Sequence, residues 1–382
     1  MQDWLKAQLK DLQAAELLRD PDDSLLHERP SPTGSAWLDA CSNDYLGLGS
    51  RSVSRETLEA LEGARLGAGA SRLVQGTHSE HAALEAELAS WVGMESALLM
   101  VSAFAANAGV LPAVAQDREG LIVSDELNHA SIVDGCRLAR ARVVVTPHLD
   151  VDAVRKALAS RSADAPAWVV TEGLFSMDGD RPDLVALRSA CDEFGAGLIV
   201  DEAHSLGVLG PAGAGLAGLL QVRTDVTIAG LGKAVGSQGG VVACSRDMRT
   251  WLWNRARSFV FSTAPSPVLC RLTLAQVRAT RAADSQRRRL EQRSAELRAA
   301  LIELGLPVVP GAAGPIVPVL LGSNERALFV MAELRQGGIL VQAIRPPTVP
   351  KGQARLRLTA HADWPDDAVP RIARALEVAC GS

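Results

Sequence analysis

Lys233 is the residue whose type and surroundings best fit covalent chemistry. It follows an apolar run at 226–229 and stands between glycines in the segment 230–236 (GLGKAVG), so its amine can emerge from a strand end into a tight pocket. A lysine presented in this way is typical of the residue that forms a Schiff base with a carbonyl compound. An ordinary turn lysine after a buried strand has the same local pattern.

Acidic and imidazole side chains follow other apolar runs in the same manner. Asp201 and His204 come directly after the run 198–200, and His129 ends a polar stretch after the run 121–123. The carboxyl ends of strands in an open parallel sheet are where such sheets bind ligands. We therefore expect these side chains to gather at one edge of a sheet.

The same three side chains suit a pyridine-ring cofactor. An anionic carboxylate such as Asp201 keeps a pyridine nitrogen protonated, and the protonated ring of pyridoxal phosphate (PLP) is an electron sink. His204 and His129 are the candidates for a hydrogen bond to the ring's phenolic oxygen and for stacking on its face. Taken singly, each histidine fits an ordinary core or strand-end position, and Asp201 fits a helix N-cap.

Three segments together resemble the α-oxoamine synthases, a family of PLP enzymes of fold type I. They are 171–180 (TEGLFSMDGD), 201–207 (DEAHSLG) and the glycine-flanked Lys233, and the resemblance runs along nearly the whole chain. It implies that PLP is the cofactor and that Lys233, Asp201 and His129 are catalytic. The residues around the ring would be Lys233, Asp201, His204, His129 and Ser176.

The resemblance also implies how the cofactor phosphate is bound. The turn 102–107 precedes a helix, so Ala103 and Phe104 would present amides at a positive helix terminus, although Ser102 also fits a simple N-cap. Gly230 stands where relatives carry Thr or Ser. The missing hydroxyl removes a hydrogen bond worth about 1.5 to 3 kcal/mol, unless water or a partner subunit replaces it.

Ser262 and Thr263 are implied to reach the phosphate of a neighbouring subunit. A homodimer with shared active sites is therefore expected. The alternative role of this hydroxyl pair is to cap the helix that is expected to begin near Pro265.

Five residues are expected to contact the substrates, and one of them is His129, which would donate to carbonyl oxygens during the reaction. Asn43, in the segment 42–47, would help to hold the amino acid carboxylate, although an Asx turn explains it equally well. Arg357 offers the same carboxylate a planar fork of donors. Arg19 and Thr348 are implied to lie near the acyl substrate, and a solvated helix-end position is the alternative for Arg19.

The segment 343–350 (AIRPPTVP) is most similar to the branch of the family that serves biotin biosynthesis. The expected reaction is a decarboxylative Claisen condensation of L-alanine with pimeloyl-CoA or pimeloyl-acyl carrier protein, which gives 8-amino-7-oxononanoate. The alternatives are a family member that uses glycine with succinyl-CoA or acetyl-CoA, an aminotransferase of the same fold, and a non-catalytic subunit.

The composition of the chain bears on its partners, its location in the cell and the role of its cysteines. The net charge of −5 argues against a nucleic acid partner. No apolar stretch reaches the length of a membrane span and the first ten residues are charged, so a cytoplasmic protein is expected. Six scattered cysteines without a C-x-x-C pair suggest neither zinc nor disulfides, and we expect all six to be small buried side chains.

The order of elements predicts an α/β fold of two lobes. Seven short apolar runs between 97 and 243, separated by helical patterns such as 151–159 and 183–193, predict a mostly parallel seven-stranded sheet. The segment 268–304 predicts two helices, and a small α+β lobe follows it. The expected domains are 1–45 with the small lobe, 46–285 as the large PLP-binding domain, and 286–382 as the small domain. The Gly-Ala patches at 67–70 and 211–218 are expected to be loops.

Overall fold

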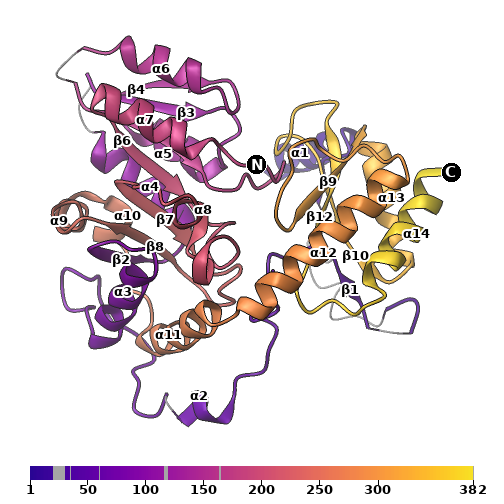
Figure 1. Cartoon of the computed structure of the whole chain (residues 1–382), viewed down its shortest axis with the longest axis horizontal. Coiled ribbons are helices and arrows are strands. Elements are labelled where there is room, and N and C mark those ends of the chain that lie inside the picture. The colour runs from indigo at the N-terminus through magenta and orange to yellow at the C-terminus, as the bar shows by residue number, and fades with distance from the viewer. Residues whose placement is uncertain (20–30, 35, 60, 116–118, 163–164, 382) are drawn as a thin grey trace. The chain divides into compact units, whose positions relative to one another are not determined.

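The computed structural model describes residues 1–19, 31–34, 36–59, 61–115, 119–162 and 165–381. It divides into two compact units (Figure 1). Unit 1 comprises Met1–Ser42, Met177–Gly179 and Arg288–Ser382, and unit 2 comprises Asn43–Ser176 and Asp180–Arg287. The domain limits expected from the sequence, at residues 45 and 285, stay a prediction of where the chain separates into functional domains.

Unit 2 contains a seven-stranded sheet in the order β2-β8-β7-β6-β5-β3-β4. The pairs β3–β4, β3–β5, β5–β6 and β6–β7 are parallel, and β8 runs antiparallel to both of its neighbours. This confirms the mostly parallel α/β fold. The strands are β2 Ser96–Met100, β3 Leu121–Asp125, β4 Arg142–Thr146, β5 Ala167–Glu172, β6 Gly197–Asp201, β7 Val226–Gly230 and β8 Gly240–Cys244.

Helices cover both faces of this sheet (Figure 1). In β6, Ile199 packs in the core cluster under α4 and α5, whereas Leu198 and Val200 pack in the cluster under α6 and α7. Successive side chains of a strand point to opposite faces, so a strand that is covered on both faces reads as a continuous apolar run. This is why the strands were readable from the sequence.

The helices of unit 2 begin and end at recognisable signals. Asp150 and Asp183 cap α6 and α7 by accepting hydrogen bonds from Ala153 N and Ala186 N, and Gly195 ends α7 at φ 61°. The helices are α2 Arg55–Glu59, α3 Ser79–Trp91, α4 Ala103–Val114, α5 Ala130–Leu138, α6 Val151–Ala159, α7 Leu184–Phe194, the 3₁₀ turn η2 Pro211–Gly213, α8 Gly215–Leu220, α9 Arg246–Arg255, α10 Arg257–Val260 and α11 Pro267–Arg281.

The prediction that 211–218 is a loop was wrong, because η2 and the start of α8 occupy it. The buried carboxylate of Glu202 accepts hydrogen bonds from Leu216 N and Ala217 N at 2.9 and 2.8 Å. This contact from a residue 14 and 15 positions earlier satisfies two of the first amides of α8, so a helix forms despite its glycine-rich sequence.

Unit 1 has the expected α+β composition. Its three-stranded antiparallel sheet has the order β11-β12-β9, and β1 pairs with β10 in a second, parallel ladder. Within the unit, Asp178 of the inserted segment pairs with Arg355 Nη1 at 2.6 Å. The elements are α1 Gln2–Ala14, β1 Leu38–Asp39, α12 Asp284–Glu303 (most of which lies in this unit), β9 Ile316–Gly322, α13 Asn324–Gln336, β10 Ile339–Leu340, β11 Gln342–Ile344, β12 Ala354–Thr359 and α14 Ala368–Gly381.

The six cysteines differ in how far they are buried. Cys136, Cys191, Cys244 and Cys270 are buried, but the prediction was wrong in degree for Cys41 and Cys380, which are only partly covered. Across the described ranges, no three His, Cys, Asp or Glu side chains are grouped to bind a metal ion. Nor is any helix in those ranges long and apolar enough to span a bilayer.

Candidate active site

The candidate site lies in unit 2, where β3, β5, β6 and β7 end. Glu172 and Asp201 are the last residues of β5 and β6, and they are paired in register. Parallel strands bring their carboxyl ends to the same edge of the sheet, so side chains from distant parts of the sequence meet there. The expected clustering of Asp201, His129 and Lys233 follows from this topology.

Asp201 is 5% exposed and its carboxylate is held from two sides. Its Oδ1 accepts a hydrogen bond from Ala203 N at 2.9 Å, and its Oδ2 accepts one from Asn107 Nδ2 at 2.6 Å. Asn107 lies on the buried face of α4 and also donates to Ser131 Oγ. Sequence reasoning gave Asn107 no role; the available signal was a polar residue in an otherwise apolar helix.

His204 is buried just after β6, and Tyr45 fixes its ring. The Tyr45 hydroxyl and His204 Nδ1 are 2.6 Å apart, and the same hydroxyl donates to Asn43 Oδ1 at 3.1 Å. Asn43 is thus part of a hydrogen-bonded chain that ends at His204. Tyr45 is the sole tyrosine of the sequence, and sequence reasoning did not assign it a function.

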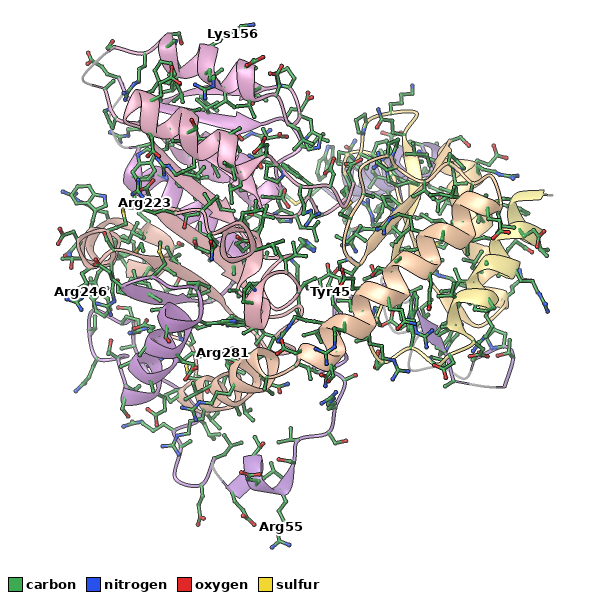
Figure 2. The ribbon with its side chains drawn as sticks, in the orientation of Figure 1. Tyr45, Arg55, Lys156, Arg223, Arg246 and Arg281 are labelled. Carbon is green, nitrogen blue, oxygen red and sulfur yellow. The ribbon has the colours of Figure 1, made fainter. Side chains whose placement is uncertain are left out.

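Lys233 is the one lysine of the chain that is not exposed. Figure 2 shows Lys156, by contrast, projecting outward from α6. The positive charge of Lys233 acts on both His129 and Glu172. Lys233 therefore lies in the same electrostatic cluster as these two side chains.

His129 is the N-cap of α5. Its Nδ1 accepts a hydrogen bond from Ser131 N at 3.2 Å, so a neutral ring carries its proton on Nε2. Its ring lies edge-on to Phe104, with centroids 6.5 Å apart. Desolvation lowers the pKa of His129, and Lys233 acts in the same direction while Asp201 opposes it. The imidazole is thus kept neutral near a carboxylate.

Glu172 is a second buried carboxyl group at this edge, and sequence reasoning did not single it out. It is 3% exposed and its Oε1 accepts a hydrogen bond from His129 N at 2.6 Å. Burial, and then the charge of Asp201, raise the pKa of Glu172 to about 8 against the hydrogen bonds from the amides of His129 and Ser176. Glu172 thereby connects the backbone segment of His129 to that of Ser176 through hydrogen bonds.

The turn before α4 is the segment predicted to bind the cofactor phosphate, and here Ser102 acts as an N-cap. Ser102 caps α4 by accepting from Ala105 N at 3.0 Å, and the leading amides of a helix, here those of Ala103 and Phe104, have no partner within it. A Cβ on Gly240 would come within 2.3 Å of Ser102 C, so only glycine allows β8 to approach this turn. A Cβ on Gly230 would meet Ala103 Cβ at 3.6 Å, which places Gly230 beside the same turn with room for a side chain.

Ser262 and Thr263 do not cap a helix. The following helix, α11, begins at Pro267 with Ser266 as its N-cap. Thr263 instead forms an isolated bridge with Ser71. Their contact with a neighbouring subunit stays a prediction.

The remaining predicted residues, Arg19, Thr348 and Arg357, belong to unit 1. Arg357 lies buried in β12, where its Nη1 donates to Thr359 Oγ1 at 3.3 Å. Burial and the charge of Arg19 both lower the pKa of Arg345, whose carbonyl accepts a hydrogen bond from Thr348 N. Arg19 and Thr348 thus each interact with Arg345, and their contact with an acyl substrate stays a prediction.

Comparison with known proteins identifies the family. The model of aminotransferase class I and II matches residues 35–376. An 8-amino-7-oxononanoate synthase from Anaeromyxobacter dehalogenans is 46% identical over 94% of this chain and 91% of its own length.

Two solved structures have the same fold as this chain. A serine palmitoyltransferase variant from S. paucimobilis, with a bound PLP-myriocin adduct, superposes with a TM-score of 0.89 at 25% identity, covering 99% of this chain and 96% of that one. An 8-amino-7-oxononanoate synthase from Francisella tularensis superposes with a TM-score of 0.77 at 25% identity. This alignment covers 90% of this chain and 98% of that one. The chain belongs to the PLP-dependent aminotransferase class I and II family, in the group of the 8-amino-7-oxononanoate synthases.

Proposed function

We propose that this chain is a PLP-dependent acyltransferase that condenses L-alanine with a pimeloyl thioester, of CoA or of acyl carrier protein. The products are 8-amino-7-oxononanoate, carbon dioxide and the free thiol, and the role is in biotin biosynthesis. The 46% identity to a relative of that name over nearly the whole chain supports this choice. The segment 343–350 supports it independently.

The residues at the edge of the sheet fit PLP. The observation that carries the proposal is the buried Asp201 carboxylate, held by Asn107 and in one electrostatic cluster with Lys233 and His129. Ala203 N and Asn107 Nδ2 already donate to this carboxylate, and its negative charge suits a protonated pyridine nitrogen as a further partner. The start of α4 offers amides to a phosphate, and Gly230 leaves space beside it.

Each side chain then has a defined task. When bound, PLP supplies an electron sink for the electrons of the broken Cα–H bond. Lys233 Nζ would hold the cofactor through its aldehyde carbon, and the lysine amine would accept the Cα proton of L-alanine. Asp201 would keep the proton on the ring nitrogen, and His204 would donate to the ring's phenolic oxygen. His129 would lie against the face of the ring.

The phosphate and the substrates are assigned to further residues. Ala103, Phe104, Ser176 and Gly230 line the cofactor, and Asn43 and Arg357 bind the carboxylate of L-alanine. In a homodimer, Ser262 and Thr263 reach the phosphate of the other subunit. Arg19 and Thr348 contact the acyl chain. The expected location is the cytoplasm.

The test compares amino acids and thioesters by the release of free thiol. L-alanine with a pimeloyl thioester should give a higher kcat/KM than glycine with succinyl-CoA or acetyl-CoA. One methyl group changes binding by only about 1 to 3 kcal/mol, so the acyl carboxylate should discriminate more strongly than the amino acid. A higher kcat/KM with either glycine pair would overturn the proposed substrates.

The shared fold suggests one more comparison in the same assay, because a serine palmitoyltransferase covers 99% of this chain at 25% identity. L-serine with palmitoyl-CoA is that additional arm. Equal or faster thiol release in that arm would replace the proposed function with a serine palmitoyltransferase activity.

A further inference from the structure

His148 lies between two carboxylates just after β4. Its Nδ1 is 2.8 Å from Asp125 Oδ1, and its Nε2 is 2.9 Å from Asp180 Oδ2. The three side chains are 19%, 10% and 12% exposed. Both ring nitrogens face acceptors, and an imidazole can donate from both only when it is protonated. Burial lowers the pKa of His148, but the two carboxylates outweigh it and raise the pKa to about 10.

Asp125 connects this cation to the loop that ends in His129. It is the last residue of β3, and its Oδ1 also accepts a hydrogen bond from Leu127 N at 2.8 Å. Its carbonyl accepts from Asn128 N, which closes the turn directly before His129. Asp125 Oδ2 accepts from Leu149 N at 2.8 Å, so the carboxylate also holds the chain beside His148.

Asp180 connects the same cation to the loop that contains Ser176. The Asp180 carbonyl accepts a hydrogen bond from Phe175 N at 3.0 Å, which closes the loop around Ser176. The Phe175 ring stands edge-on to His148, with centroids 4.5 Å apart. Because residues 177–179 are grouped with unit 1, Asp180 is the point at which the chain returns to unit 2.

The two loops thus meet at two places. At Glu172, one carboxyl group accepts the amides of both His129 and Ser176. At His148, one cation bridges Asp125 and Asp180. We propose that His148 is a positioning residue of the active site, which holds the loops of His129 and Ser176 in register through Asp125 and Asp180. This inference rests on the proposed function in assigning His129 and Ser176 to the cofactor.

A second cation that bridges two carboxylates, although more exposed ones, provides a control. Arg188 on α7 pairs with Asp192 at 2.8 Å and with Asp225 at 2.7 Å, and its side chain is 11% exposed. Asp225 Oδ2 also accepts from Leu198 N, near the start of β6 and therefore at the opposite end of that strand from Asp201. Arg188→Gln removes a comparable bridge away from the candidate site.

The experiment compares His148→Gln with Arg188→Gln in two measurements that do not require activity. A glutamine amide has donors at one end only, so it cannot bridge both carboxylates. Hydrogen–deuterium exchange of the apo protein is followed in peptides that contain the amides of His129 and Ser176, and the Kd for PLP is measured by equilibrium titration. We expect His148→Gln to raise both exchange rates and the Kd by about 10-fold, as loss of a charged hydrogen bond would. Arg188→Gln should lower Tm but leave the exchange rates and the Kd for PLP within about 2-fold of the wild-type values.

Two outcomes would overturn the inference. The first is a His148→Gln variant that lowers Tm as Arg188→Gln does and leaves exchange and PLP affinity unchanged. The second concerns Asp180→Ala, which removes this acceptor, keeps the contact of His148 with Asp125 and serves if His148→Gln does not fold. In this variant, amide exchange should be faster than in the wild type at Ser176 and unchanged at His129. An equal increase at both amides would contradict the bridge.

Failure of the proposed function is recognised separately. If the wild-type protein binds PLP but condenses none of the tested substrates, the exchange pattern still decides the role of His148. If the protein does not bind PLP, the exchange data decide only whether the bridge exists. The proposed positioning role of His148 is then refuted along with the proposed cofactor site.

Discussion

Asn107 donates a hydrogen bond to Asp201 Oδ2 across 2.6 Å and thereby ties α4 to the end of β6. The same amide nitrogen donates to Ser131 Oγ, near the start of α5. Asn107 thus connects α4 to the end of β6 and to the start of α5. The Asp201 carboxylate is held by this distant side chain and by Ala203 N, two positions further along the chain. This contact fixes the acceptor that the proposed mechanism requires.

Asn107→Leu should weaken PLP binding. Leucine has a similar volume and removes the donor, so Asp201 loses a hydrogen bond to a charged group worth about 1.5 to 3 kcal/mol. The Kd for PLP should rise by about 10- to 100-fold. Ser131→Ala is the control, because it leaves the contact of Asn107 with Asp201 in place, and its Kd should change far less. Equal effects of the two variants would show that α4 packing, not the donor, decides the affinity.

Borohydride reduction of the protein with PLP should label Lys233. This lysine is the one that is not exposed, and it lies near Asp201 and His129. Mass spectrometry should find the pyridoxyl group on the peptide that contains Lys233 and not on Lys156. Lys156→Ala should be labelled as the wild type is, whereas Lys233→Ala should not be. A label on Lys156 or Lys351 in the wild type would overturn the assignment.

The strands and the cofactor lysine were predictable because their signals are local. A strand buried on both faces is an unbroken apolar run, and Lys233 is marked by the glycines on either side. Asn107 and Tyr45 were not predictable in the same way, because their roles depend on contacts with Asp201 and His204, 94 and 159 residues away in sequence. No pattern within one element encodes such a contact.

His148 and Glu172 illustrate a second limit. Glu172 was visible within a family motif, but its raised pKa depends on burial and on Asp201 in the neighbouring strand. His148 gave no signal at all, because both of its carboxylate partners are more than 20 positions away. The helix at 215–220 was missed because the carboxyl group that stabilises its start belongs to Glu202, which lies outside the helix and 14 positions before Leu216.

Glu172→Gln should change the pH dependence of stability of the apo protein. The pKa of Glu172 in the folded state, about 8, lies above its ordinary value of 4.5, so the folded protein retains a proton that the unfolded chain releases between these values. The stability of the wild type relative to the variant is thus greatest below pH 4.5, falls as the pH rises towards 8 and is level above it. Tm values of both proteins at pH 5 to 9 test this. A constant difference would contradict the raised pKa.

Gly230→Thr should tighten PLP binding, because it restores a hydroxyl beside the turn that starts α4. A Cβ at this position would meet only Ala103 Cβ at 3.6 Å and Ala203 Cβ at 3.7 Å, both ordinary van der Waals contacts, so the backbone need not move. The gain should be at most about 1.5 to 3 kcal/mol, the contribution of one hydrogen bond to a charged acceptor, or about 10- to 100-fold in Kd. Gly230→Ala is the matched control, since it adds the Cβ without the hydroxyl, and it should leave the Kd nearly unchanged. An equal Kd for the threonine and alanine variants would show that another donor, such as a water or a residue of the partner subunit, already serves the phosphate.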